Sequence, residues 1–234
     1  MYSNEQQSTL RPATPSGKPF AFSYSRMKNF EVCPRRHNEV DLKRSVKEGE
    51  SEQLTWGNSV HKSLERRVGY GEKLPIGMEM YEPLAAKIAS SKGKILVEQQ
   101  LAINKDFGPT AWFAPNAWFR AKIDVAVVME PVALLGDYKT GKIIEDSVQL
   151  KLAAAAFFAH APAIQKIRSK FYWLGDGIET PVDVARDDMP KFWSSIWPRV
   201  EQLKTAYDTN NYPPIPGRLC RRWCPVKSCE YWGK

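Results

Sequence analysis

Residues 118–139 read WFRAKIDVAVVMEPVALLGDYK, and this stretch decides the fold. Apolar residues occupy every second position before Glu130-Pro131, and a second apolar run follows that pair, as in two β-strands joined by a tight turn. We therefore expect strands over 118–128 and 132–138. If they pair symmetrically about the turn, Asp124 and Asp137 lie directly opposite each other.

Two carboxylates that face each other repel unless a cation lies between them, and Mg²⁺ or Mn²⁺ prefers such oxygen ligands. Lys139 comes two residues after Asp137, so both side chains project from the same face of the strand. A divalent metal lowers the pKa of water that it binds, and an ammonium group stabilises negative charge on phosphate. The pattern favours phosphodiester hydrolysis, although Asp-x-Lys is common and also fits surface charges beside a bend.

The rest of the chain places this hairpin in an α/β domain with helices packed on a mixed central sheet. Residues 94–103 read as a strand with Ile95, Val97, Gln99 and Leu101 on one face. Further strands are expected over 167–174 and 182–185. Helices are expected over 56–68, 78–92, 147–160 and 188–208, after a first helix that Ser23 or Ser25 caps and that runs toward Cys33.

Other polar side chains could complete a metal site. In the helix at 56–68, Gly57, His61 and Glu65 follow each other at i+4 spacing, beside an apolar row of Trp56, Val60, Leu64 and Val68. A neutral imidazole at His61 could be a metal ligand, although a half-buried helix histidine is the more common explanation for such a residue taken alone. Glu98 alternates away from Val97 and is a further candidate ligand. Gln149 opens the helix after the Asp-x-Lys strand, where helix N-termini face phosphates.

The composition agrees with a polyanionic partner such as DNA. The 234 residues include 34 Lys+Arg against 26 Asp+Glu, a net charge of +8 with a pI near 9.3. A basic surface that is simply exposed to solvent, with no DNA partner, would give the same net charge and pI. No apolar run of ~18 residues is present, so we expect no membrane span. Candidate DNA contacts are Arg120, Lys122, Arg221 and Arg222.

Three regions are expected along the chain. Residues 1–19 are polar and Pro-rich, which indicates a flexible tail without a signal peptide and favours a cytoplasmic location. Residues 20–209 form the core, and residues 210–234 form a Cys-rich segment. The four cysteines, Cys33, Cys220, Cys224 and Cys229, are enough for one [4Fe–4S] or Zn²⁺ site that joins the first helix to the C-terminal tail. Reduced cysteines in a flexible tail are the alternative.

In order along the chain, these motifs resemble the PD-(D/E)XK nuclease superfamily, and most closely its RecB-type domains and the CRISPR-adaptation exonucleases that carry an iron–sulfur cluster. The likeness runs from about residue 22 to the C-terminus. It is carried by FSYS at 22–25 with CPRR at 33–36, GNSVH at 57–61, Ile123-Asp124, GDYKTG at 136–141, Gln149 and the closing cysteines. Two positions depart from the family pattern: Arg120-Ala121-Lys122 replaces a glycine, and Ala153 replaces a tyrosine.

The resemblance implies a restriction-endonuclease-like core in which His61, Asp124, Asp137 and the backbone carbonyl of Tyr138 bind the metal. Lys139 would be catalytic with Asp124, Asp137 and Gln149, and Glu98 matches a loosely placed family acid. The resemblance also favours [4Fe–4S] over Zn²⁺ at the cysteines.

We therefore expect a Mg²⁺- or Mn²⁺-dependent DNA exonuclease that acts on DNA ends or single strands in recombination, repair or CRISPR-type processing. A recombination or CRISPR protein is a candidate partner. Two alternatives stay open at this point. One is a non-catalytic iron–sulfur or zinc DNA-binding module with the nuclease fold, and the other is a structure-specific endonuclease.

Overall fold

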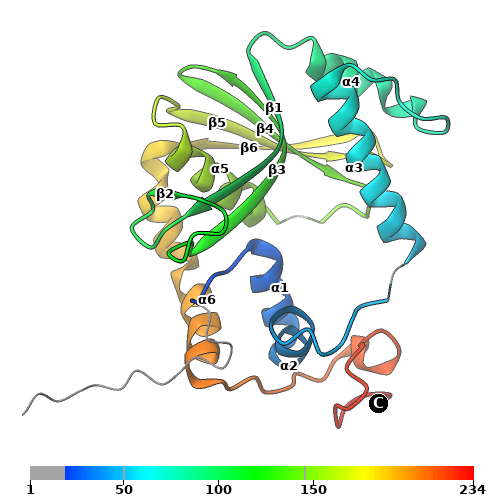
Figure 1. Ribbon diagram of the computed structural model, residues 1–234, viewed down its shortest axis with the longest axis vertical. Helices are drawn as coiled ribbons and strands as arrows, with labels where there is room; N and C mark the ends of the chain where they lie inside the picture. Colours follow the sequence, from blue (N-terminus) through cyan, green and yellow to red (C-terminus); the bar gives the residue numbers. More distant parts are fainter. Residues whose placement is uncertain (1–18, 50, 145) are drawn as a thin grey trace, which may run out of the picture.

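The computed structural model describes residues 19–49, 51–144 and 146–234 and has a six-stranded mixed sheet at its centre (Figure 1). The strand order is β2-β1-β3-β4-β5-β6, in which only β4 and β5 pair in parallel. This confirms the expected mixed α/β class. The strands are β1 (Lys94–Ile103), β2 (Pro109–Thr110), β3 (Phe119–Met129), β4 (Val132–Lys139), β5 (Lys166–Trp173) and β6 (Ile178–Ala185).

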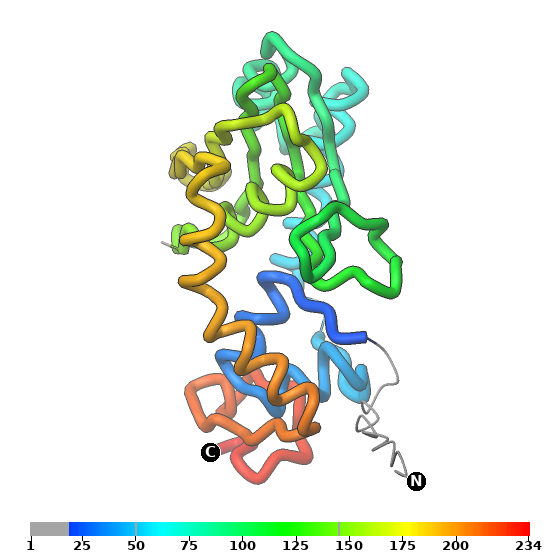
Figure 2. Tube along the Cα trace, turned by 90° about the vertical axis from the view of Figure 1, so that its left-hand side faces the viewer, coloured from blue at the N-terminus to red at the C-terminus, as the bar shows by residue number. Residues whose placement is uncertain are grey.

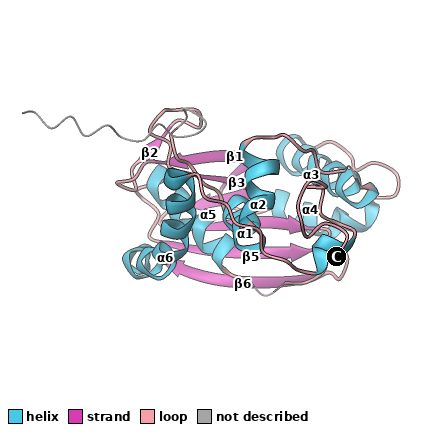
Figure 3. Cartoon of the chain, turned by 90° about the horizontal axis from the view of Figure 1, so that it is seen from below, coloured by secondary structure: helices cyan, strands magenta, loops and turns pink. Residues whose placement is uncertain are grey.

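Helices cover both faces of the sheet (Figures 1 and 3). On one face α3 and α4 bury an apolar cluster against the strands, and on the other α5 and α6 bury a larger one. A short π-helix follows α2, and 3-10 turns precede α4 and α6. The α-helices are α1 (Tyr24–Val32), α2 (Pro34–His37), α3 (Glu52–Tyr70), α4 (Glu82–Ala89), α5 (Val148–His160) and α6 (Met189–Thr209).

Helix α3 is longer than the sequence predicts. The Ser51 hydroxyl accepts a hydrogen bond from the Leu54 N–H at 3.1 Å, and Gly71 ends the helix with a φ of 73°. Val60, Leu64 and Val68 form the buried row that the i+4 spacing predicts. Trp56 was expected in that row but is exposed, because the first turn and a half of α3 lies in solvent.

The β3–β4 hairpin has the predicted register. Met129 pairs with Val132, and the pairing continues to Val125 and Gly136. Gly136 permits close packing there, because a Cβ atom at this position would lie 2.5 Å from the Tyr172 ring and 2.8 Å from a Val125 methyl group. The pairing ends at this point, so Asp124 and Asp137 lie just beyond the last pair, where the strands separate.

The expectation that β1 keeps one set of side chains on one face is wrong. Ile95 and Val97 pack in the cluster under α3 and α4, whereas Leu101 packs in the cluster under α5 and α6. Glu98 lies between them and has a left-handed φ of 49°, which changes the phase of the alternation.

Strand β3 changes face at the matching position. Ile123 packs under α5 and α6, but Val125 packs under α3 and α4. Val97 pairs with Val125 and Gln99 pairs with Ile123, so Glu98 and Asp124 lie side by side at the point where both strands change face.

The other boundaries differ from the predictions mainly at the ends of elements. The helix expected over 78–92 is a 3-10 turn at Glu79–Tyr81 followed by α4, and the strand expected over 182–185 begins at Ile178. Ser23, of the two candidate caps, accepts a hydrogen bond from the Arg26 N–H. No helix in the described ranges is long and apolar enough to cross a membrane.

The N-terminal helices α1 and α2 and the C-terminal segment lie at the same end of the molecule (Figures 1 and 2). The Phe22 N–H donates to the Trp118 carbonyl and the Arg120 N–H donates to the Phe22 carbonyl, which fixes the start of α1 beside β3. The segment after α6 runs back along α1 and α2 (Figure 2). The expected flexible tail over residues 1–19 lies, apart from Pro19, outside the described residues.

Candidate active site

A cleft of about 1090 Å³ opens where α1, β3, β4 and α5 meet. Asp124 and Asp137 both contribute to its wall, so the hairpin brings together the two carboxylates that the sequence singled out. Other lining residues from the predicted set are His61, Arg120, Lys122, Lys139, Gln149 and Ala153.

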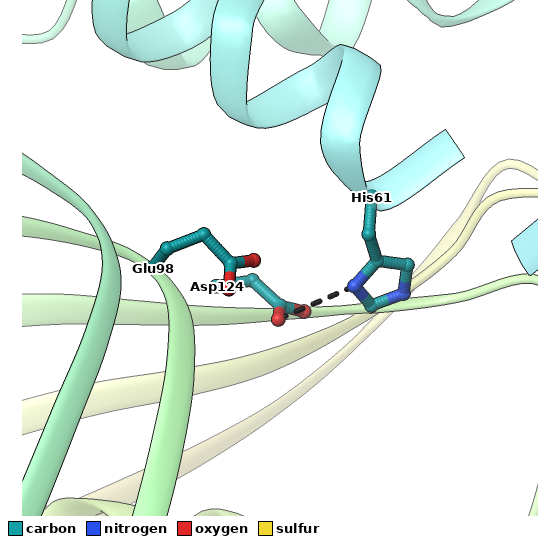
Figure 4. Close-up of side chains that lie close together, drawn as sticks. All are labelled: His61, Glu98 and Asp124. Atoms are coloured by element: carbon teal, nitrogen blue, oxygen red, sulfur yellow. Dashed lines mark ion pairs between the residues drawn. The ribbon is translucent and has the colours of Figure 1, made fainter. Parts of the chain in front are cut away.

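His61, Glu98 and Asp124 form one half of the candidate site (Figure 4). Each offers one ligand atom, and these atoms lie within 4.8 Å of one another. The Nδ1 atom of His61 is 3.3 Å from an Asp124 carboxylate oxygen. An imidazole and two carboxylates suit a divalent cation such as Mn²⁺ or Mg²⁺. The chemistry of this donor set therefore fits the expected metal.

The position of His61 depends on a close approach of α3 to the end of β4. A Cβ atom on Gly57, one turn before His61, would lie 3.0 Å from the Thr140 hydroxyl. The His61 ring packs edge-on against the Tyr138 ring, with 5.8 Å between the ring centroids. Tyr138 also donates its backbone N–H to the Asp124 carboxylate at 2.7 Å, so Asp124 is held from two sides.

Asp137, Lys139 and Gln149 form the other half of the site. The Lys139 ammonium lies 2.7 Å from one Asp137 oxygen, as expected for side chains two residues apart on one strand. The Gln149 amide donates to the other Asp137 oxygen at 2.7 Å and accepts from Lys139 at 3.1 Å. Gln149 is therefore hydrogen-bonded to both residues, beside which the resemblance had placed it in the catalytic set.

Asp137 and Glu98 bind protons more tightly than ordinary carboxylates. Burial, partly offset by the Lys139 charge and reinforced by Asp124, raises the pKa of Asp137 to about 6. Burial and the Asp124 charge also raise the pKa of Glu98. Burial opposes the charged form of His61, but the hydrogen bond and charge of Asp124 outweigh it and raise the pKa of His61. The site thus has an excess of negative charge that a cation would relieve.

The four candidate DNA contacts divide into two pairs. Lys122 is exposed, with its ammonium 4.0 Å from the Glu98 carboxylate, and Arg120 donates to the Trp112 carbonyl at 2.7 Å. Both line the cleft. Arg221 and Arg222 are exposed on the C-terminal segment and do not line it.

The sequence analysis missed several residues of the cleft. The Tyr24 hydroxyl donates to the Asp146 carboxylate at 2.8 Å, which links α1 to the loop after β4. That contact joins positions 122 residues apart, and no local pattern signals it. The basic residues Arg26, Lys43 and Arg44 and the aromatic pair Trp112-Phe113 also line the cleft. The Trp-Phe pair in a short loop before a strand was the one available signal.

Cys33 lies between α1 and α2, and its sulfur accepts a hydrogen bond from the Ile215 N–H at 3.5 Å. The C-terminal segment that carries Cys220, Cys224 and Cys229 therefore contacts Cys33 at Ile215. Among the described residues, no three cysteine sulfurs lie within 4.8 Å of one another. A four-cysteine cluster stays a prediction.

Comparisons with known proteins support the fold. No protein-family model and no curated protein matches the sequence. A crystal structure from Eubacterium rectale with the name "Putative exonuclease" is similar in three dimensions, with a TM-score of 0.53 and 11% sequence identity. The match covers 98% of this chain and 92% of that chain. The chain thus shares its overall architecture with that protein.

The raised pKa of Asp137 predicts a pH-dependent change in stability. Between pH 3.8 and about pH 6 the unfolded chain already ionises this carboxyl group while the folded, metal-free protein keeps it protonated, so stability falls as pH rises through this window and levels off above it. In EDTA at pH 8, Asp137→Asn should raise the free energy of unfolding by up to about 3 kcal/mol, because a tenfold change in proton affinity corresponds to about 1.4 kcal/mol. At pH 4 the gain should be much smaller.

Urea unfolding at both pH values measures this difference. Asp183→Asn is a matched control, because Asp183 is exposed and its hydrogen bond with Arg168 lowers its pKa. The control should show no gain at pH 8. An Asp137→Asn gain that is equal at pH 4 and pH 8 would show that burial does not perturb this carboxyl group.

Proposed function

We propose that this protein is a metal-dependent DNA nuclease, and that it acts as an exonuclease on DNA ends or single strands. The single observation that carries the proposal is the meeting of His61 and Asp124 with the Asp137–Lys139–Gln149 group in one cleft, with Glu98 beside His61 and Asp124. The overall architecture shared with the Eubacterium rectale protein supports the same class of enzyme.

Mg²⁺ or Mn²⁺ would be bound by His61, Asp124, Asp137 and the backbone carbonyl of Tyr138, with Glu98 as a further ligand. The bound metal would supply Lewis-acid polarisation of the scissile phosphate. Asp124 is fixed for this role by the Tyr138 N–H, and His61 by its contact with the Tyr138 ring. In the metal-free chain, Glu98 and Asp124 repel each other, which favours cation binding.

Lys139 is the proposed catalytic cation. Its ammonium lies beside Asp137 and can stabilise the negative charge that develops on the phosphate during hydrolysis. Gln149 accepts a hydrogen bond from Lys139 and donates one to Asp137, so it keeps the two groups in a fixed relation. Gln149 is therefore assigned a positioning role within the catalytic set.

DNA would approach along the basic side of the cleft. Arg120 and Lys122 lie there with Arg26, Lys43 and Arg44, and these cations can contact backbone phosphates. Arg221 and Arg222 would extend the contact from the C-terminal segment. The resemblance in the sequence suggests a role in recombination, repair or CRISPR-type DNA processing in the cytoplasm, with a recombination or CRISPR protein as partner.

The C-terminal segment would form a separate structural unit over residues 210–234. We propose that Cys33, Cys220, Cys224 and Cys229 hold a [4Fe–4S] cluster, with Zn²⁺ as the alternative. The contact between the Ile215 N–H and the Cys33 sulfur supports this, because it brings the segment to the first cysteine. Such a cluster would close a long loop and so stabilise the folded chain.

The central prediction concerns cleavage. Asp124→Asn and Lys139→Met should each reduce cleavage of labelled single-stranded DNA in Mn²⁺ by about 100-fold or more, since each removes an electrostatic contribution to the transition state. EDTA should abolish cleavage by the wild-type protein. A time course on linear and circular substrates also separates exonuclease from endonuclease action.

Lys142→Met is the matched control for Lys139→Met, because Lys142 is an exposed lysine on the loop that follows β4. It should cleave at the wild-type rate, and all variants should keep the wild-type circular dichroism spectrum. Full activity in a folded Asp124→Asn or Lys139→Met variant would refute the proposed function. DNA binding without any cleavage by the wild-type protein would favour a non-catalytic module.

The cysteine proposal has its own test. Protein purified without oxygen should be brown, with a broad visible absorption and about four irons per chain for a [4Fe–4S] cluster. Cys33→Ser should lose the colour and lower the melting temperature, since the cluster joins distant parts of the chain. A colourless wild-type protein with one zinc per chain would show that the four cysteines hold Zn²⁺ instead of an iron–sulfur cluster. Absence of both metals would refute the cysteine site.

A further inference from the structure

Phe113 is a large apolar side chain that the fold leaves in solvent. It is 87% exposed, although it lines the same cleft as the candidate metal ligands. Neighbouring Trp118 and Phe119, in contrast, are almost fully buried. Within the described chain, no aromatic ring packs against Phe113. A phenyl group held in water at the wall of a cleft has an open face for a ligand.

The loop that carries Phe113 is fixed on both sides. The Ala114 N–H donates to the Ala111 carbonyl, and the Ala117 N–H donates to the Ala114 carbonyl, each at 3.0 Å. Arg120 donates to the carbonyl of Trp112 at 2.7 Å and lies 5.9 Å from the centre of the Trp112 ring. The backbone on both sides of Phe113 is therefore held in place, so little conformational entropy of the loop would be lost when a ligand binds to the ring.

The surroundings of Phe113 are basic. Arg120 and Lys122 follow it along the chain, and Arg26, Lys43 and Arg44 line the cleft with it. Beyond Asp124 and Asp137, which belong to the candidate site, the described lining includes one further acid, Asp41, which His37 and Asn29 bind by hydrogen bonds. Lys43 pairs with Glu39 at 2.9 Å and Lys122 lies 4.0 Å from Glu98, so the arginines are the stronger candidates for phosphate contact. Positive charge in the same cleft as an exposed aromatic ring is the combination that binds unpaired nucleic acid.

We infer that Phe113 stacks on an unpaired base of single-stranded DNA and so selects unpaired strands for the cleft. The inference rests on the proposed nuclease function and specifies its substrate class. In a duplex, neighbouring base pairs cover both faces of every internal base, so an aromatic side chain can reach a base face only at an end or in an unpaired strand. A phenyl ring has no hydrogen-bonding group, and the stacking therefore carries no base preference.

Binding in EDTA tests this inference without any need for cleavage. Fluorescence anisotropy should give an affinity of Phe113→Ala for a labelled oligothymidylate about tenfold below that of the wild-type protein. This corresponds to about 1.4 kcal/mol, within the usual range for stacking on one base. Affinity for a relaxed, covalently closed duplex circle, which has no ends and no unpaired bases, should change less than about twofold when the circle competes with the labelled strand. Phe113→Trp should bind the single strand like the wild type, and Phe113→Leu should bind it as weakly as Phe113→Ala.

Two controls identify the source of the loss. Tyr70→Ala removes another exposed ring, which ends α3 and does not line the cleft, and should leave both affinities unchanged. An oligonucleotide with abasic residues should bind the wild-type protein more weakly than the intact strand. It should bind Phe113→Ala with no further loss, because the ring that stacks on the bases is already absent.

Some results would overturn the inference. They are equal losses for the single strand and the closed duplex circle, full affinity in Phe113→Leu, or full affinity in Phe113→Ala. The last result would leave a protein partner as the reason for the exposed ring. In a cleavage assay, Phe113→Ala should raise KM for single strands about tenfold and keep kcat. A wild-type protein that binds as described but never cleaves refutes the proposed function and leaves the stacking intact.

Discussion

The candidate site depends on the point where strands β1 and β3 change face together. Glu98 has a left-handed backbone there, a conformation that typically costs about 1–3 kcal/mol and persists only where the surroundings enforce it. The apolar residues on either side of it pack in different cores, which fixes the change of phase. As a result Glu98 and Asp124 lie together beside His61, although burial and the Asp124 charge both raise the pKa of Glu98.

The second half of the site follows from the end of the β3–β4 pairing. The strands separate after Val125 and Gly136, and the Tyr138 N–H bonds the Asp124 carboxylate instead of a strand partner. Asp137 accepts a hydrogen bond from Gln149 on α5 with one oxygen, and its other oxygen lies 2.7 Å from the ammonium of Lys139 on β4. Tyr138 thus connects both halves: its backbone holds Asp124, its ring contacts His61, and its neighbours on β4 are Asp137 and Lys139.

Local patterns in the sequence were enough to predict most of the fold. Strand alternation and the Glu130-Pro131 turn predicted the hairpin register, and the i+4 row predicted the buried face of α3. The change of face at Glu98 could not be predicted, because alternation assumes an extended backbone and nothing nearby signals a positive φ. The link between Tyr24 and Asp146 and the exposed ring of Phe113 depend on how distant segments pack. The roles proposed for His61, Asp124, Asp137 and Lys139 come from the motifs, and the structure adds their proximity.

The metal site is tested most directly by soaking a crystal of the protein in Mn²⁺ and recording the anomalous diffraction of manganese. If His61 and Asp124 bind the metal, an anomalous peak should lie within ligand distance, about 2.0–2.6 Å, of both side chains. His61→Ala should weaken the peak and Asp124→Asn should remove it. A fully occupied peak elsewhere, or no peak beside His61 and Asp124 at saturating Mn²⁺, would contradict the claim that the change of face at Glu98 and Asp124 builds a metal site.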